Sequence, residues 1–306
     1  MEIVGTSLAI RKLREQISKI AQTNASVLIQ GESGTGKELV AMSIHEQSVR
    51  HNKDFVAINC GAIPESLMES LLFGYEGGAF SGARKEGQKG LLEKANGGTV
   101  FLDEAGEMPY SLQAKMLRTL QNFKIRRVGS SSPIQLDVRI VAASNKDLRK
   151  EVIQGTFRED LFYRLDVIPL IVPPLRERKE DIPLLIEYFL RQVSIDKTKK
   201  YTLTSGLIQR FIEYDWPGNI RELKNFIEYG VCFCEDGILT NDLMEPRFKL
   251  ALAACGEVDN NVSLKNEQIS DIQNALDQFG RSVEGKRKAA AYLGISLATL
   301  YRKIKK

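Results

Sequence analysis

Short apolar runs alternate with helical patterns over the first part of the chain. Because these runs are continuous and lie between helical segments, they are typical of parallel strands covered on both faces. The pattern therefore predicts an α/β domain over residues 1–173, built as a three-layer parallel sheet. The expected strands are Val27–Gln30, Phe55–Asn59, Thr99–Leu102, Arg139–Ala143 and Val167–Ile171.

The pattern changes at Pro173-Pro174, which interrupts the strand and helix alternation. Apolar residues then recur at helical spacing, as in Ile182, Leu185, Ile186 and Phe189. These positions predict a smaller all-helical domain over residues 174–250. The polar stretch Gly256 to Asn261 indicates a linker, which we place at residues 251–262.

Residues 263–306 carry a third helical unit, predicted to be a small all-α domain. Arg287 to Leu293 favours a helix ended by Gly294, and Ser296 can cap the next helix. Helix, short glycine-containing turn and helix is the helix-turn-helix arrangement, whose second helix enters the major groove of DNA. Candidate DNA contacts are Ser296, Thr299, Tyr301, Arg302 and Lys303.

Charge is distributed unevenly along the 306 residues. Residues 281–306 contain eight basic residues and one acid, so this segment carries +7 while the whole chain carries +4. A basic segment on a slightly acidic body suggests a polyanionic partner at that end. The alternative is a charged face that only contacts water.

Other features indicate a cytoplasmic protein. The longest apolar runs fall far short of the ~20 residues that span a bilayer, and the N-terminal residues do not resemble a signal peptide. The four cysteines show no metal-ligand spacing and are expected to be reduced thiols.

A glycine-rich loop follows the first expected strand and precedes a helical pattern. Such a loop turns its backbone N–H groups toward phosphate oxygens, and its lysine reaches the terminal phosphates. The acid at position 38 replaces the hydroxyl residue that usually ligates magnesium. The loop reads Gly31-Glu32-Ser33-Gly34-Thr35-Gly36-Lys37-Glu38.

Two acids end the third expected strand, at Asp103 and Glu104. An apolar strand that delivers carboxylates beside a phosphate loop suits Mg²⁺ binding and activation of water. We expect Asp103 to hold the metal, partly through water, and Glu104 to polarise the attacking water. An exposed acidic turn would explain the two acids alone but not their pairing with the loop.

These motifs closely resemble the central domain of bacterial sigma-54-dependent activators. That family has the same phosphate loop, including Glu38, and a Gly-Ala-Phe-Thr-Gly-Ala loop that engages the sigma factor. Here the second loop reads Gly78-Ala79-Phe80-Ser81-Gly82-Ala83, with serine in place of threonine. The C-terminal unit resembles the Fis-type helix-turn-helix of these activators. The resemblance implies an AAA+ fold in which residues 174–250 form a helical lid.

The resemblance also assigns roles to single residues. Asn59 matches a switch asparagine that positions Glu104, and Asn145 matches the first sensor of the terminal phosphate. Arg158 and Arg164 match two arginines presented to the neighbouring subunit, although surface ion pairs would also explain them. Arg221 matches the second sensor in the lid; since a cation at a helix N-terminus is unfavourable, phosphate contact is a natural reason for its position.

The sequence thus predicts an ATPase that activates transcription. It would bind ATP and Mg²⁺, bind a two-fold DNA site as a dimer, and assemble into a ring of six. Its loop at Phe80 would then remodel the closed complex of the sigma-54 RNA polymerase holoenzyme. Two alternatives are a DNA-binding regulator in which ATP is only a structural ligand, and an AAA+ loader or clamp-type motor.

Overall fold

The computed structural model describes residues 3–79, 84–193, 200–251 and 253. The chain divides into two compact units, Met1–Thr240 and Asn241–Lys306. In the second unit, residues 241–251 are helical. The expected helix-turn-helix lies outside the described residues, and every element named below belongs to the first unit.

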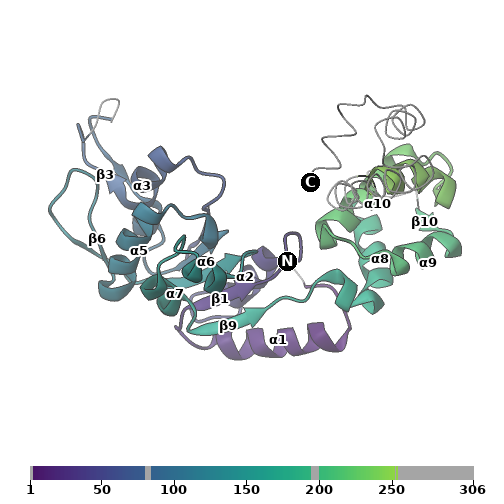
Figure 1. The fold of residues 1–306 in the computed structure, drawn as a ribbon, viewed down its shortest axis with the longest axis horizontal. Helices are drawn as coiled ribbons and strands as arrows, with labels where there is room; N and C mark the ends of the chain where they lie inside the picture. Colours follow the sequence, from purple (N-terminus) through teal and green to yellow (C-terminus); the bar gives the residue numbers. More distant parts are fainter. Residues whose placement is uncertain (1–2, 80–83, 194–199, 252, 254–306) are drawn as a thin grey trace, which may run out of the picture. The chain divides into compact units, whose positions relative to one another are not determined.

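A five-stranded parallel sheet forms the centre of the first unit, in the order β2-β5-β8-β1-β9 (Figure 1). Each of the five expected strands is present, with its ends within one residue of the predicted ones. The prediction of a parallel sheet is therefore confirmed. The strands are β1 (Val27–Gln30), β2 (Phe55–Asn59), β5 (Thr99–Asp103), β8 (Arg139–Ser144) and β9 (Ile168–Ile171).

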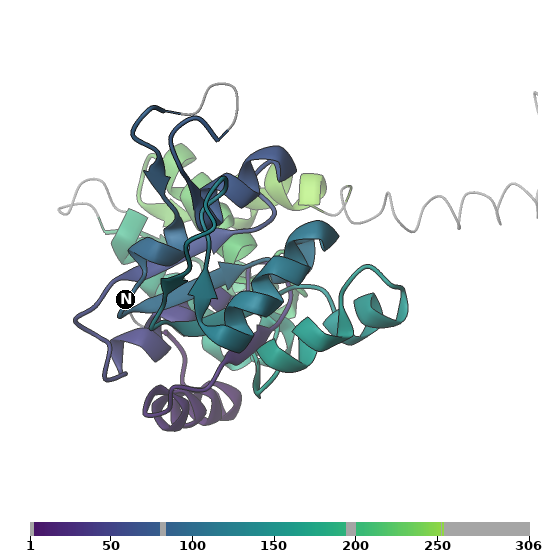
Figure 2. The same cartoon turned by 90° about the vertical axis from the view of Figure 1, so that its left-hand side faces the viewer.

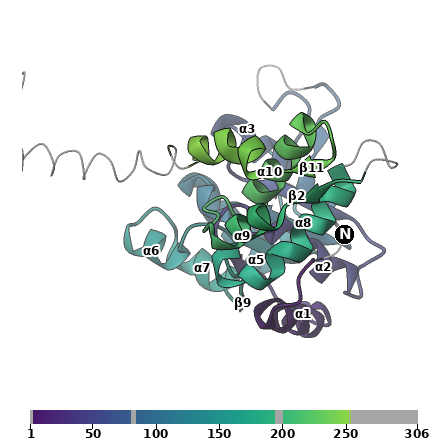
Figure 3. The same ribbon diagram turned by 90° about the vertical axis from the view of Figure 1, so that its right-hand side faces the viewer.

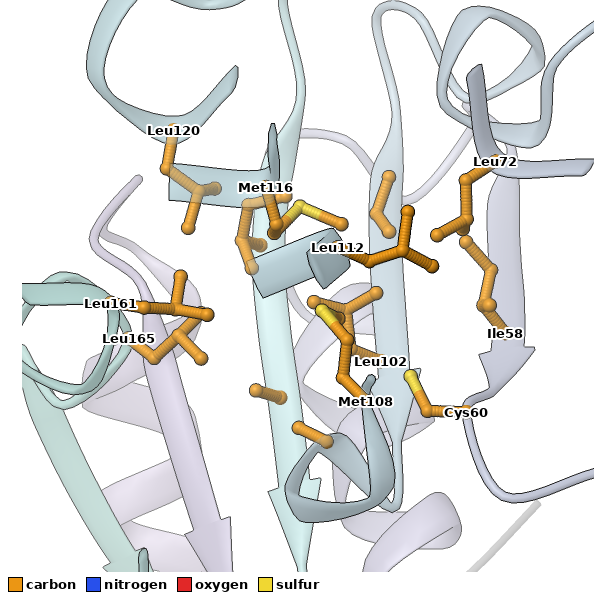
Figure 4. Close-up of a cluster of buried hydrophobic side chains, with 14 of the residues drawn as sticks. Ile58, Cys60, Leu72, Leu102, Met108, Leu112, Met116, Leu120, Leu161 and Leu165 are labelled. Atoms are coloured by element: carbon orange, nitrogen blue, oxygen red, sulfur yellow. The ribbon is translucent and has the colours of Figure 1, made fainter. Parts of the chain in front are cut away.

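Helices cover both faces of this sheet. Successive strand residues point to opposite sides, and apolar side chains on both sides must be covered. Val27 and Ile29 belong to an apolar cluster with α1 (Leu8–Ala21) and α2 (Lys37–Glu46). Leu28 belongs to the other cluster, which includes residues of α3, α5 and α7. Figure 4 shows part of this second cluster, where Leu102 and Met108 lie below Leu112. The helices on this side are α3 (Glu65–Phe73), α4 (Leu91–Lys94), α5 (Tyr110–Asn122), α6 (Leu148–Ile153) and α7 (Glu159–Leu165).

A helical region follows the sheet, as the sequence predicts (Figure 3). Its core is an aromatic group in which Trp216, fully buried, packs edge-on against Phe211 and Phe226. The structure adds one feature to the expected helices, a two-residue parallel pair of β10 (Thr202–Leu203) and β11 (Ile238–Leu239). The helical elements are η2 (Leu175–Glu177), η3 (Lys179–Asp181), α8 (Ile182–Val193), α9 (Ser205–Glu213) and α10 (Asn219–Phe233).

Two hairpins extend from the sheet domain (Figure 2). The segment Gly74 to Gly90 shows little regular pattern in sequence, yet β3 (Gly74–Tyr75) pairs antiparallel with β4 (Gln88–Lys89) at its base. The second hairpin joins β6 (Lys124–Ile125) to β7 (Ile134–Gln135). Backbone bonds connect the two hairpins, because Val128 donates to the Gly74 carbonyl at 2.8 Å. The first hairpin therefore has a fixed base.

A membrane-crossing helix is absent from the described part of the chain, where none of the helices combines the necessary length and apolar character.

Candidate functional site

The glycine-rich loop connects β1 to α2, as the sequence predicts. Gly34 and Gly36 have φ values of 77° and 98°, which side chains adopt only with strain. A Cβ on Gly34 would also lie 2.3 Å from the Gly218 carbonyl, so the loop approaches another backbone closely. Only glycine therefore fits at position 34.

Lys37 is the first residue of α2 and points back across the loop. Its Nζ donates to the carbonyls of Gly31 at 2.9 Å and Glu32 at 3.0 Å. Burial lowers the pKa of Lys37, and the nearby charges of Asp103 and Glu104 oppose this shift. The ammonium group is thus a partly desolvated cation at the mouth of the loop.

The two acids at the end of β5 lie beside Lys37, and both are half-buried. Glu104 has a left-handed backbone, with φ 51° and ψ 44°, and its N–H donates to Asp103 Oδ1 at 3.0 Å. A Cβ built on Gly61 would lie 2.3 Å from Glu104 Oε2. The left-handed turn therefore directs the Glu104 carboxylate toward the end of the neighbouring strand β2.

Asn59 is the last residue of strand β2 and lies two positions before Gly61. Its side-chain oxygen accepts hydrogen bonds from the backbone N–H groups of Gly61 and Ala62, both at 2.9 Å. The same Cβ position on Gly61 that meets Glu104 lies 3.5 Å from Asn59 Oδ1. The structure thus brings Asn59 and Glu104 together, 45 positions apart in the sequence.

The two expected sensors, Asn145 and Arg221, line the same cavity as the loop. Asn145 follows strand β8 and lines the same cavity as Lys37 and Glu104. Arg221 lies in the first turn of α10, and its Nη1 donates to Ser33 Oγ at 3.0 Å. Both residues are exposed, so their side chains can reach a ligand in the cavity.

The loop, Lys37, the two acids, Asn145 and Arg221 line one cavity of about 440 Å³, and Asn59 reaches it only through its neighbour Glu104. Its lining combines the loop, Lys37 and the two acids with a group of apolar side chains. This combination suits a ligand with a polyanionic tail and a flat apolar body. The apolar lining comes from Ile3, Val4, Ile10, Leu13, Val172, Leu185, Phe189 and Ile220. A larger cavity of about 740 Å³ lies between α3, α5 and the second hairpin, and contains neither the loop nor the acids.

Two charged residues of this site were missed in the sequence. Arg178 is buried, lines the cavity and donates to the Thr35 carbonyl at 3.2 Å. Burial lowers its pKa, while the charge of Asp181 opposes the shift. Asp181 is fully buried and accepts from the N–H groups of Thr6 at 2.6 Å and Ser7 at 2.8 Å. In sequence both belong to a charged run after Pro174, which resembles a solvated turn.

The start of α10 has an unusual geometry. The helix begins at Asn219, but Asn219 has φ 54° and its side chain does not cap the helix. Glu222 accepts from the Gly218 N–H at 2.8 Å instead. The amide of Asn219 contacts the phosphate loop, where Nδ2 donates to the Ser33 carbonyl at 3.0 Å.

The two arginines expected to act in a neighbouring subunit lie at α7. Arg158 forms an ion pair with Asp160 at 2.8 Å, and Arg164 Nη2 donates to the Leu120 carbonyl at 3.0 Å. The surface ion pair considered as an alternative is therefore present for Arg158. Arg164 is exposed, so it remains accessible to a second molecule.

The loop expected to engage the sigma factor is described only in part. Gly78 and Ala79 continue from strand β3, and a Cβ on Gly129 of the second hairpin would lie 2.9 Å from Ala79 Cβ. Phe80, Ser81, Gly82 and Ala83 lie outside the described residues. The five candidate DNA contacts between Ser296 and Lys303 also lie outside them.

Comparison with protein families finds three matching models along the chain. Residues 3–171 match the sigma-54 interaction domain, and residues 176–257 match the AAA+ ATPase lid domain. Residues 272–306 match the Fis family of bacterial regulatory proteins.

Several curated proteins are similar over the whole chain. A signal-transduction and transcriptional-control protein of Clostridium beijerinckii is 48% identical over 100% of this chain and 48% of its own length. The regulatory protein AtoC of Escherichia coli K12 is 44% identical over 99% of this chain and 67% of its own length. The chain spans about half the length of several relatives that it matches.

The structure of NtrX from Brucella abortus in complex with ATP has 35% sequence identity and a TM-score of 0.74. The match covers 100% of this chain and 69% of that one. NtrX has also been solved in complex with ADP, with a TM-score of 0.74.

Proposed function

The chain belongs to the family of sigma-54 interaction domains with an AAA+ lid, and on this premise we propose that it is an ATP-hydrolysing activator of sigma-54-dependent transcription. The observation that carries the proposal is the single cavity in which Lys37, Asp103 and Glu104 meet Arg221 of the lid. A phosphate loop, paired acids and a lid cation around one space suit phosphoryl transfer.

ATP binds with its phosphates on the loop Gly31–Glu38 and its base among the apolar side chains of the cavity. The backbone N–H groups of the loop and the N-terminus of α2 attract phosphate. Lys37 Nζ then exchanges the carbonyls of Gly31 and Glu32 for the terminal phosphate oxygens. The related NtrX has been solved in complex with ATP, which supports ATP as the ligand.

The residues present suit magnesium that is shared with the nucleotide. In the described part of the chain, no group of three or more acidic, histidine or cysteine side chains could hold a metal alone. Mg²⁺ commonly takes one or two carboxylates together with phosphate and water oxygens. Asp103 would hold the ion, partly through water, and the ion would offset negative charge on the transferring phosphoryl group.

Glu104 orients the water that attacks the terminal phosphorus. The bond to the bridging oxygen breaks, so the products are ADP and inorganic phosphate. Asn59 sets the position of the Glu104 carboxylate according to the nucleotide bound, and Asn145 contacts the terminal phosphate. In the ring, Arg158 and Arg164 of one subunit reach the site of the next, and a trans arginine accelerates related reactions about 10³ to 10⁵-fold.

We assign residues 1–173 to the ATPase subdomain, 174–250 to the lid, 251–262 to a linker and 263–306 to the DNA-binding domain. The DNA-binding domain places dimers on a two-fold site, and the dimers assemble into a hexamer. The loop Gly78–Ala83 follows strand β3 in sequence, and we expect it to transmit movement from the ATPase site to sigma-54.

The test is formation of open complexes by sigma-54 RNA polymerase at a promoter in the presence of ATP. Lys37→Ala should abolish both hydrolysis and open complexes, because the terminal phosphate loses its cation. Phe80→Ala should retain hydrolysis and lose open complexes. Phe233→Ala, at an aromatic residue 58% exposed on α10, is the matched control and should retain both.

If the wild-type protein hydrolyses ATP and never opens the promoter, the sigma-54 assignment is wrong. An ATP-regulated DNA-binding protein would then explain the chain better. If Phe80→Ala opens the promoter as well as the wild type does, the loop is not the coupling element.

A further inference from the structure

Glu32 is an acid within the proposed phosphate loop, and its carboxylate is bonded to Arg176 and Asn219. It forms a two-pronged pair with Arg176 of η2, with Oε1 to Nη2 at 2.6 Å and Oε2 to Nη1 at 2.7 Å. These hydrogen bonds from Arg176 hold the pKa of Glu32 below its ordinary value. The pair neutralises the acid, so Glu32 serves a contact other than phosphate.

Asn219 connects the same carboxylate to the lid. Its side chain is fully buried, and Nδ2 donates to Glu32 Oε2 at 3.1 Å and to the Ser33 carbonyl at 3.0 Å. Its Oδ1 accepts from the Leu175 N–H at 2.8 Å. The amide nitrogen therefore donates twice to the phosphate loop, and the amide oxygen accepts from the first residue of η2. A buried amide with all its bonds made holds those segments in one arrangement.

The first turn of α10 also bonds to the loop through its backbone. The N–H groups of Ile220 and Arg221 both donate to the Gly34 carbonyl, at 3.0 Å and 3.3 Å. Arg221, the expected sensor, lies two residues after Asn219. Any movement of Asn219 relative to the loop therefore moves Arg221 relative to the phosphates.

We propose that Glu32, Arg176 and Asn219 form a latch that fixes the first turn of α10 on the phosphate loop and so aims Arg221 at the terminal phosphate. They act as positioning residues, and the proposal rests on the assignment of Arg221 as a nucleotide sensor. A misplacement of about 1 Å in such a group can cost about 10²-fold in function.

The latch makes a prediction that a purely structural contact does not. It should contribute to binding of a triphosphate and not to binding of a diphosphate, because the proposal aims Arg221 at the third phosphate. Removing the latch should also have no further effect once Arg221 has been removed. Both statements can be measured with ADP and with ATPγS, a slowly hydrolysed triphosphate.

The experiment is a double-mutant cycle on the full chain, with dissociation constants measured by calorimetry in Mg²⁺. The measured quantity is the ratio of the ADP constant to the ATPγS constant. Arg221→Ala should lower the ratio about tenfold, the low end for a charge-assisted hydrogen bond. Glu32→Gln should lower it about threefold, as for a partly exposed ion pair.

Asn219→Gly is the second variant, and it should lower the ratio about fivefold, as one buried hydrogen bond would. Glycine accepts the left-handed backbone at this position, so the change removes the amide without strain. It keeps the test valid if Glu32→Gln fails to fold. Glu187→Gln is the control, because it removes an exposed ion pair with Arg191 on α8 and should leave the ratio unchanged.

In combination with Arg221→Ala, either latch variant should give the ratio of Arg221→Ala alone. Multiplicative losses in the double variants would overturn the latch, as would equal losses for ADP and ATPγS. If Arg221→Ala itself leaves the ratio unchanged, the sensor assignment fails and the latch fails with it. If Arg221→Ala lowers the ratio and neither latch variant does, only the latch is wrong.

Discussion

Asp181 holds the N-terminal segment of the chain in place through a buried carboxylate. The N–H groups of Thr6 and Ser7 both donate to its Oδ1, at 2.6 Å and 2.8 Å. The preceding residues Ile3 and Val4 contribute apolar side chains to the lining of the nucleotide cavity. We therefore expect Asp181→Ala to lower both the stability of the first unit and its affinity for nucleotide.

The size of the effect follows from the burial of each partner. Ser7 is 3% exposed, so its N–H would lose an ionised acceptor that water does not replace. Thr6 is exposed, so water can replace part of its lost bond. A buried donor left without its partner costs about 1–3 kcal/mol, and more when that partner is charged, so we expect a total loss of about 3 kcal/mol. Asp181→Asn keeps an acceptor oxygen and should cost about 1 kcal/mol.

Urea unfolding of the first unit and hydrogen exchange at the Ser7 amide measure this prediction. The matched control is Asp215→Ala, which removes the same charge from a side chain that is 77% exposed and paired with Lys179. The control should change stability by less than about 0.5 kcal/mol, as is usual at the surface. The reasoning would be refuted if both variants lost the same free energy of unfolding. It would also be refuted if the Ser7 amide stayed protected from hydrogen exchange in Asp181→Ala. Affinity for ADP and ATP should fall by the same factor, because the base end is shared.

Three further predictions concern catalysis, thiol reactivity and pH. Glu104→Gln and Arg158→Ala should each be inactive alone, and an equal mixture of the two should recover about a quarter of the wild-type ATPase rate. In a head-to-tail ring, about one interface in four pairs the intact Glu104 of one variant with the intact Arg158 of the other. A mixture without activity would contradict the role of Arg158 in the neighbouring site. Burial raises the pKa of Cys60 to about 12, so iodoacetamide at pH 8 should label exposed Cys232 and spare Cys60, as peptide mass mapping would show. The pKa of Glu32 is lowered in the folded state, so ionised Glu32 stabilises the fold above its unfolded pKa of about 4.3, and this contribution is lost as the pH falls below that value. The urea concentrations at half-unfolding of the wild type and of Glu32→Gln should therefore become equal at acidic pH.

The sheet could be predicted from the sequence because each strand is a continuous apolar run. In β1, Val27 and Ile29 pack on one face and Leu28 on the other, so all three must be apolar. Polar residues at the carboxyl ends of such strands meet at one edge of a parallel sheet. Asn59 and Asp103 are direct partners in the register of β2 and β5, so the core of the site was also predictable.

Asp181 and Arg178 could not be predicted from the sequence, because their hydrogen-bond partners lie far away along the chain. Asp181 bonds to residues 174 and 175 positions away, and Arg178 to a residue 143 positions away. Within a charged run after two prolines, periodicity gives no reason to bury either one. The hairpin base at Gly74–Tyr75 was missed for another reason, since two residues are too few to show a period.

The charges that line the nucleotide cavity have a consequence for how ATP is bound. Four basic side chains face three carboxylates there, namely Lys37, Arg178, Arg221 and Lys224 against Glu38, Asp103 and Glu104. The net charge of the lining is small compared with that of a polyphosphate, and the carboxylates repel it at short range. A divalent cation between Asp103 and the phosphates would convert that repulsion into attraction, so ATP should bind far more weakly in EDTA than in Mg²⁺. By the same reasoning Glu104→Gln, which removes one of the repelling charges, should bind ATP more tightly than the wild type and should lose less affinity in EDTA. If calorimetry shows the same dependence on metal in both proteins, the Glu104 carboxylate does not face the phosphates.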